Sequence, residues 1–148
     1  MIKLKLISIL SLLFVLNVAS MCSDDDDTST QVSNPTEIAS TLADGQWIVT
    51  LYKENDVVQT SNYSGYNFTF GADGALSATN GSTTQSGDWS TYTDSGYTKL
   101  DMMFTALDGP FEEISEDWRV ISRTTTKIEL KHISGGDGST DYLTFEKD

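Results

Sequence analysis

Apolar and polar residues alternate along most of the chain after residue 46. In 47–52 and 66–70, every second side chain is apolar, with Trp47 and Phe68 among them. A period of two is typical of strands that bury one face. Turn signals such as Asp73-Gly74 separate the alternating segments. The pattern predicts eight strands, over residues 47–52, 66–70, 75–79, 87–92, 98–104, 118–123, 127–132 and 141–145.

Eight short strands at even spacing predict an all-β fold. An antiparallel up-and-down meander can close into a barrel or form a sandwich, and closure removes exposed sheet edges. Two helical segments are expected beside the strands. Ile38 and Leu42 lie four residues apart, which predicts a short N-terminal helix over 36–43 that stops at Gly45. Residues 111–114 predict one helical turn before strand 6, which is the segment 118–123.

The first 27 residues follow a different pattern, in which an apolar run precedes an acidic one. Lys3 and Lys5 stand before an apolar run over 6–19, the arrangement of a secretory signal. The run is shorter than the roughly 20 apolar residues that a membrane-spanning helix requires. We therefore expect a signal peptide over residues 1–21, removed by cleavage.

Cys22, the only cysteine, follows this run directly. The junction Val18-Ala19-Ser20-Met21-Cys22 resembles the lipobox of bacterial lipoproteins, which implies an acylated Cys22 and a membrane anchor. The residues that follow Cys22 are Ser23, Asp24, Asp25, Asp26 and Asp27. This segment resembles the acidic export signal of surface lipoproteins in Bacteroidetes-type bacteria. Together the two resemblances imply a lipid-anchored outer-membrane protein that faces the cell exterior. A plain secreted protein with a charged tether is the alternative.

The chain divides into three expected regions. These are the signal peptide, an acidic flexible tether over 22–36, and one barrel domain over 37–148. Loss of the signal removes Lys3 and Lys5 and changes the formal net charge from −13 to −15. A field of this sign repels phosphates, so we expect no nucleic acid partner. The domain has no further cysteine for a disulfide. We also expect the protein to be a monomer.

Gly45-Gln46-Trp47, at the start of the first predicted strand, resembles the Gly-x-Trp signature of lipocalins. The segments that follow, from Phe68-Thr69-Phe70 to Tyr142-Leu143-Thr144-Phe145, are similar to the small lipocalin-like domains of Bacteroidetes lipoproteins. The resemblance implies an eight-stranded calycin-type barrel in which Gly45 and Trp47 are structural. It also implies a small apolar ligand in the barrel, although strands this short predict a shallow cup that side chains can fill.

The residues able to do chemistry form no known catalytic motif. His132, the only histidine, continues the apolar face of Ile128 and Leu130 and is expected at the barrel mouth. Tyr63 and Tyr97 stand in polar segments with Gly and Ser, so we expect both on a binding rim. We predict no metal site and no cofactor. A solvated loop explains four acidic residues better than paired hydrolytic carboxylates do, namely Glu112, Glu113, Glu116 and Asp117.

The leading hypothesis is a non-enzymatic cell-surface lipoprotein whose barrel binds a small molecule or glycan, with Tyr63, Tyr97 and His132 near the ligand. The first alternative is a protein–protein interaction module, in which a solid barrel docks an outer-membrane or host partner through its acidic surface. The second is a glycoside hydrolase that uses the acidic cluster, or a hydrolase that uses His132. A cavity in the barrel would favour the first hypothesis, and a contiguous exposed apolar patch would favour the interaction module.

Overall fold

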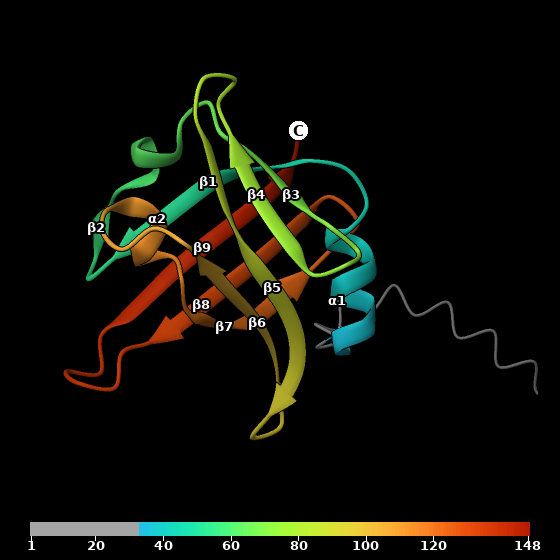
Figure 1. Cartoon of the computed structure of the whole chain (residues 1–148). Helices are drawn as coiled ribbons and strands as arrows, with labels where there is room; N and C mark the ends of the chain where they lie inside the picture. Colours follow the sequence, from blue (N-terminus) through green and yellow to red (C-terminus); the bar gives the residue numbers. More distant parts are fainter. Residues whose placement is uncertain (1–32) are drawn as a thin grey trace, which may run out of the picture.

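The structure, a computed structural model, describes residues 33–148. Its strands form one antiparallel sheet that closes into a barrel (Figure 1). The strands are β1 (Trp47–Glu54), β2 (Val57–Val58), β3 (Asn67–Phe70), β4 (Ala75–Thr79), β5 (Thr84–Asp94), β6 (Tyr97–Phe104), β7 (Asp117–Arg123), β8 (Lys127–Ile133) and β9 (Thr140–Lys147). Three short helical segments accompany them, α1 (Pro35–Leu42), η1 (Thr60–Tyr63) and α2 (Pro110–Glu113). The predicted all-β barrel is confirmed, as are the short N-terminal helix and the helical turn before β7, which is the sixth of the eight predicted strands.

The barrel closes because β1 pairs on both of its sides. It pairs with β9 along six register positions and with β3 through Trp47 and Phe68. The strands β3 to β9 follow one another as an up-and-down meander. The two-residue strand β2 only extends the outer end of β1, after a turn at Asn55 and Asp56, which both have positive φ. Eight strands therefore make the wall, and β2 is an addition that the alternation did not predict.

Helix α1 covers the end of the barrel where β1 begins and β7 ends. The side chain of Asn34 caps the helix by accepting a hydrogen bond from the Glu37 amide, as expected of an N-cap. Ile38 and Leu42 are fully buried on its inner face. Trp47 then fixes the helix to β1, because its indole Nε1 donates to the Leu42 carbonyl over 2.9 Å. Trp47 is itself fully buried.

The opposite end of the barrel is covered by η1 and α2. The Tyr63 hydroxyl donates to the Pro110 carbonyl over 2.6 Å and so joins the two segments. Phe111 packs against Tyr63, Tyr66 and Phe68 with ring centroids 4.9–6.1 Å apart. Aromatic rings thus cover this end too.

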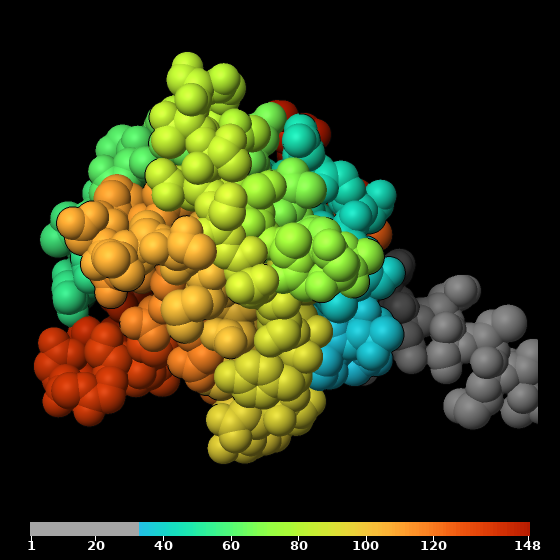
Figure 2. All heavy atoms as spheres, in the orientation of Figure 1, coloured from blue at the N-terminus to red at the C-terminus, as the bar shows by residue number. Residues whose placement is uncertain are grey.

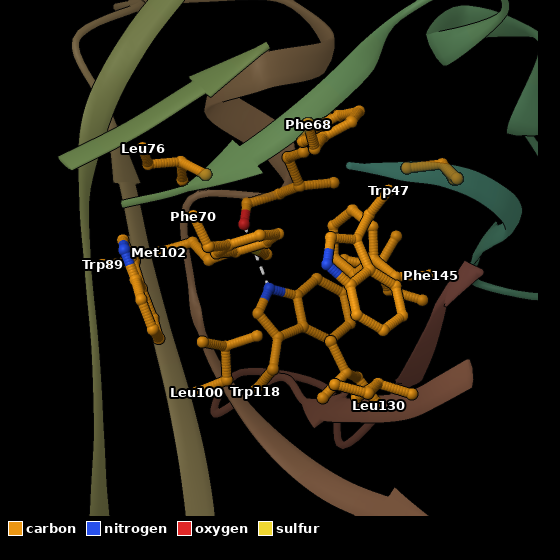
Figure 3. Close-up of a cluster of buried hydrophobic side chains, with 14 of the residues drawn as sticks. Trp47, Phe68, Phe70, Leu76, Trp89, Leu100, Met102, Trp118, Leu130 and Phe145 are labelled. Atoms are coloured by element: carbon orange, nitrogen blue, oxygen red, sulfur yellow. Dashed lines mark hydrogen bonds between the residues drawn. The ribbon is translucent and has the colours of Figure 1, made fainter. Parts of the chain in front are cut away.

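Large side chains fill the space between the two covered ends. Trp47, Trp118 and Phe145 point toward one another in the centre, and Phe70 and Leu100 pack around them (Figure 3). All five residues are at most 1 % exposed. On the face that Figure 2 shows, side chains also cover the strands closely, and the β5–β6 hairpin projects below them. The barrel interior is a packed core, so the shallow cup expected from the lipocalin resemblance is occupied by the protein's own side chains.

Several sequence-based expectations concern residues 1–32 and lie outside the described residues. They include the signal peptide, the acylation of Cys22, the export signal Ser23–Asp27 and most of the tether. Helix α1 begins at Pro35 and Ser33 is buried, so the packed part starts before residue 37. Across residues 33–148, no helix is long and apolar enough to cross a membrane.

Candidate functional site

A row of outward-facing side chains crosses five neighbouring strands on the outside of the barrel. The sheet register aligns its members one beside another, from β5 to β9, as Tyr92, Lys99, Arg119, Lys131 and Tyr142. Their sequence neighbours, such as Thr98, Leu100, Trp118 and Leu130, are buried, because side chains alternate between the two faces of a strand. The row places three cations side by side between two tyrosines.

A pocket of about 280 Å³ opens along this row beside the β5–β6 hairpin. Six charged, polar or aromatic side chains from β6, β7 and β8 line the pocket, namely Tyr97, Lys99, Asp117, Arg119, Lys131 and His132. Asp94 and Ser95 of the hairpin and Ile133 at the end of β8 complete the lining. We call this pocket the outer-face pocket. It lies on the wall of the barrel rather than at its mouth.

Arg119 occupies a defined position in the pocket because it stacks on an aromatic ring. Its guanidinium carbon lies 3.3 Å from the centroid of the Tyr97 ring. A guanidinium on a ring face gains a cation–π attraction while its N–H groups point outward in the guanidinium plane. Neither the Arg119 nor the Lys131 side chain forms a hydrogen bond or an ion pair with a residue in 33–148. Two half-buried cations therefore face the pocket without an anionic partner from the described part of the chain.

Three further ionisable groups of the pocket, Lys99, Asp117 and His132, have oppositely charged neighbours, whereas the Asp94 carboxylate accepts only from the Ser95 hydroxyl among the described residues. Lys99 Nζ lies 2.8 Å from Asp117 Oδ2, and only 18 % of the Lys99 side chain is exposed. His132 lies between two carboxylates, with Nδ1 3.6 Å from Asp117 Oδ1 and Nε2 3.9 Å from Glu116 Oε2. Its ring also packs edge-on against Trp118 at 5.9 Å. The pocket thus contains one ion pair, Lys99–Asp117, and one histidine that lies between two carboxylates.

Glu116, Asp117 and His132 are also the described residues best placed to hold a metal ion. One donor atom from each lies within 4.8 Å of the others. Two carboxylate oxygens and one imidazole nitrogen form a ligand set that suits several divalent cations. Lys99 competes for this position, because its ammonium already neutralises Asp117 at 2.8 Å. Sequence analysis did not predict this group, since its three members come from two separate strands and a loop.

The sequence predicted that Tyr63, Tyr97 and His132 lie near a ligand, and the structure places these residues differently. Tyr97 and His132 both line the outer-face pocket, although His132 lies on the barrel wall rather than at an open mouth. The expectation for Tyr63 is wrong. It is 1 % exposed and its hydroxyl is used by Pro110, so it belongs to the core and not to a rim. Burial of the ring also raises the pKa of the Tyr63 hydroxyl above its usual range, with Tyr52 and Glu113 adding to the effect.

The acidic cluster does not form one site. Glu112 and Glu113 belong to α2, and Glu113 faces Tyr52 and Glu54, whereas Glu116 and Asp117 face His132. Burial raises the pKa of the Glu113 carboxyl, and the neighbouring charges of Glu54 and Glu112 raise it further. The division follows from the chain path, because α2 ends before Glu116 and the chain then turns into β7.

The comparisons with known proteins bear on the fold. No protein-family model matches this chain, and no curated protein matches it either. A solved structure is similar. It is a DUF4847 family protein from Bacteroides vulgatus, 16 % identical, with a TM-score of 0.51, and the match covers 75 % of this chain and 97 % of that protein. At this identity the likeness extends to the fold of the barrel, and it carries no function.

Proposed function

We propose that this protein is a cell-surface lipoprotein whose lipocalin-like barrel binds a small molecule or glycan without catalysis, and that the binding site is the outer-face pocket. The observation that carries the proposal is the pair Arg119 and Tyr97. A stacked guanidinium with unused donors, on the wall of a pocket of about 280 Å³, is arranged for a ligand. Small-molecule sites in proteins commonly measure roughly 300–1,000 Å³, so this pocket suits a small ligand or a single saccharide unit.

The proposed site lies on the barrel wall rather than in the interior, where the lipocalin resemblance places a ligand, and the reason is physical. The interior of a lipocalin-type cup must hold empty volume, whereas here Trp47, Trp118 and Phe145 occupy the centre. Opening such a core would cost the burial of several large side chains, each about 1.5–3 kcal/mol. A ligand on the outer face requires no such change.

The binding proposal is tested with the purified full-length protein against a panel of saccharides and small metabolites. Tyr97→Ala should abolish binding of any ligand of the outer-face pocket, because it removes both a lining ring and the platform under Arg119. Tyr142→Ala is the matched control, since Tyr142 is an outward tyrosine of the same row that does not line the pocket. Equal binding by both variants would place the ligand elsewhere.

The anchor proposal rests on the lipobox resemblance of Cys22 and on the acidic residues Asp24–Asp27. Several acyl chains, at about 0.8 kcal/mol per buried CH₂, would attach the protein to the outer membrane. Radiolabelled palmitate should enter the wild type and not Cys22→Ala. Surface protease should cleave the wild type on intact cells and spare a variant with Asp24–Asp27 changed to Ala. Unlabelled wild type in the growth medium would contradict the anchor.

An interaction module is the second candidate, and the filled interior favours it because that hypothesis requires a solid barrel. Large apolar side chains are exposed outside the pocket, including Leu107 at 95 % and Met103 at 56 %. Binding of a protein partner that is lost in Leu107→Ser and kept in Tyr97→Ala would select this function over ligand binding.

A further inference from the structure

We propose that the ligand of the outer-face pocket is an acidic saccharide, whose carboxylate is held between Arg119 and Lys131. This inference rests on the proposed function and names the chemical class of its ligand.

The charge distribution is the first argument. The chain has 22 acidic residues against 9 basic ones. Three of those basic residues, Lys99, Arg119 and Lys131, nevertheless line one pocket, against the two carboxylates of Asp94 and Asp117. Clustered cations repel one another, and in a protein with so many carboxylates an internal partner would be easy to supply. Since Lys99 has such a partner and the other two have none in the described chain, Arg119 and Lys131 leave room for an external anion.

The orientation of Arg119 is the second argument. Tyr97 covers one face of the guanidinium at 3.3 Å, which restricts the side chain to one plane. A guanidinium held in this way presents two parallel N–H groups, the geometry that binds a planar carboxylate through two hydrogen bonds. Because the register pairs Arg119 directly with Lys131, the ammonium can approach the same carboxylate from the neighbouring strand. The two cations thus differ in role: Arg119 orients the anion and Lys131 adds charge.

The remaining lining identifies a saccharide rather than a bare anion. Asp94, Ser95 and His132 place acceptors and donors around the pocket, as several hydroxyl groups on one ring require. Ile133, which is 56 % exposed, adds an apolar surface for the C–H face of the ring. An acidic peptide would need an extended groove or an open sheet edge, whereas this pocket lies on the face of paired strands and holds about 280 Å³.

The test compares acidic sugars with their neutral parents. Glucuronic acid and galacturonic acid are titrated into the full-length protein, alongside glucose and galactose, with binding followed by NMR shifts or calorimetry. At least one acid should bind ten or more times tighter than its neutral parent. Arg119→Lys should weaken that binding at least tenfold, because an ammonium cannot form the two parallel hydrogen bonds. Lys131→Met should weaken it as well.

Lys127→Met is the matched control for Lys131→Met. Lys127 faces outward from the same strand, pairs with Glu129 at 3.1 Å and does not line the pocket, so its loss should leave the affinity unchanged. If acidic and neutral sugars bind equally and Tyr97→Ala abolishes both, the acidic class is overturned while the proposed glycan site stands. If no acid binds better than its parent, or if a glutamate-rich peptide binds better than every sugar, the inference is overturned. Absence of any ligand across the wider panel would instead count against the proposed function.

Discussion

The Tyr63 hydroxyl shows what one buried polar atom contributes to this barrel. This hydroxyl donates the hydrogen bond that joins η1 to α2. The Tyr63 ring packs against the Tyr52 ring, with the ring centroids 5.4 Å apart. Tyr63→Phe keeps the ring and leaves the Pro110 carbonyl without its donor. We expect the free energy of unfolding to fall by about 1–2 kcal/mol, measured by urea denaturation. Tyr97→Phe is the control and should change it by less than about 0.5 kcal/mol, because no described residue bonds to that hydroxyl.

Glu113 is a carboxylate whose charge the folded state disfavours. Its Oε2 atom is buried without a hydrogen-bond partner among residues 33–148, and burial raises its pKa, with Glu54 and Glu112 adding to the shift. A raised pKa means that the folded protein holds the proton more tightly than the unfolded chain does. The stability from this group is therefore present below the unfolded carboxyl pKa of about 4.3 and is lost as the pH rises through the folded value.

Glu113→Gln removes this titration while it keeps the shape of the side chain. The variant should be more stable than the wild type at pH 7, by up to about 1 kcal/mol, and the difference should shrink as the pH falls to about 4. Urea denaturation at the two pH values measures both differences. Glu112→Gln is the control, since Glu112 is exposed on the same helical turn and should show no such gap. A wild type that is the more stable at pH 7 would contradict the argument.

At the scale of an element, Gly87 sets how closely β5 and β6 approach each other. It pairs directly with Phe104, and a Cβ at Gly87 would lie 2.7 Å from the Phe104 Cα and closer still to the Met103 carbonyl oxygen. These contacts are backbone, so they cannot move aside without disturbing the pairing. Gly87→Ala should cost about 1–3 kcal/mol of unfolding free energy in urea. Gly136→Ala, where a Cβ meets nothing within 4 Å, should cost far less, and an equal loss in both variants would contradict this role.

The elements also show how far the sequence could be read. Alternation located all eight wall strands, because a half-buried strand leaves a period of two in the chain. The helical turn α2 before β7 was also predicted. Alternation placed the start of β5 at 87, whereas the strand begins at Thr84, because 84–86 are polar on both faces. Tyr63 was misplaced for a related reason. Its sequence neighbours are Asn and Ser, and it is buried by contacts with distant residues, namely Tyr52, Phe111 and the Pro110 carbonyl. The outer-face pocket depends on register across three strands, and one sequence does not reveal which residues face each other.

At the scale of the whole molecule, two electrostatic effects act in opposite directions. The formal net charge of −13 repels itself, which weakens the folded state at low ionic strength. The outer-face pocket instead concentrates cations, so an anionic ligand is attracted to it most strongly at low ionic strength. Salt therefore affects folding and binding with opposite signs, and a single titration can separate them.

We expect the unfolding temperature at pH 7 to rise by several degrees when NaCl increases from about 0.02 M to about 0.5 M, since the screening length falls from roughly 20 Å to roughly 4 Å. Over the same range, the affinity for an acidic sugar should fall. Calorimetry measures both quantities on one sample. Near pH 4.2, the isoelectric point given by the sequence, the net charge vanishes and the unfolding temperature should no longer depend on salt. An unfolding temperature that falls with salt at pH 7 would show that the ion pairs, such as Lys99–Asp117, outweigh the net repulsion.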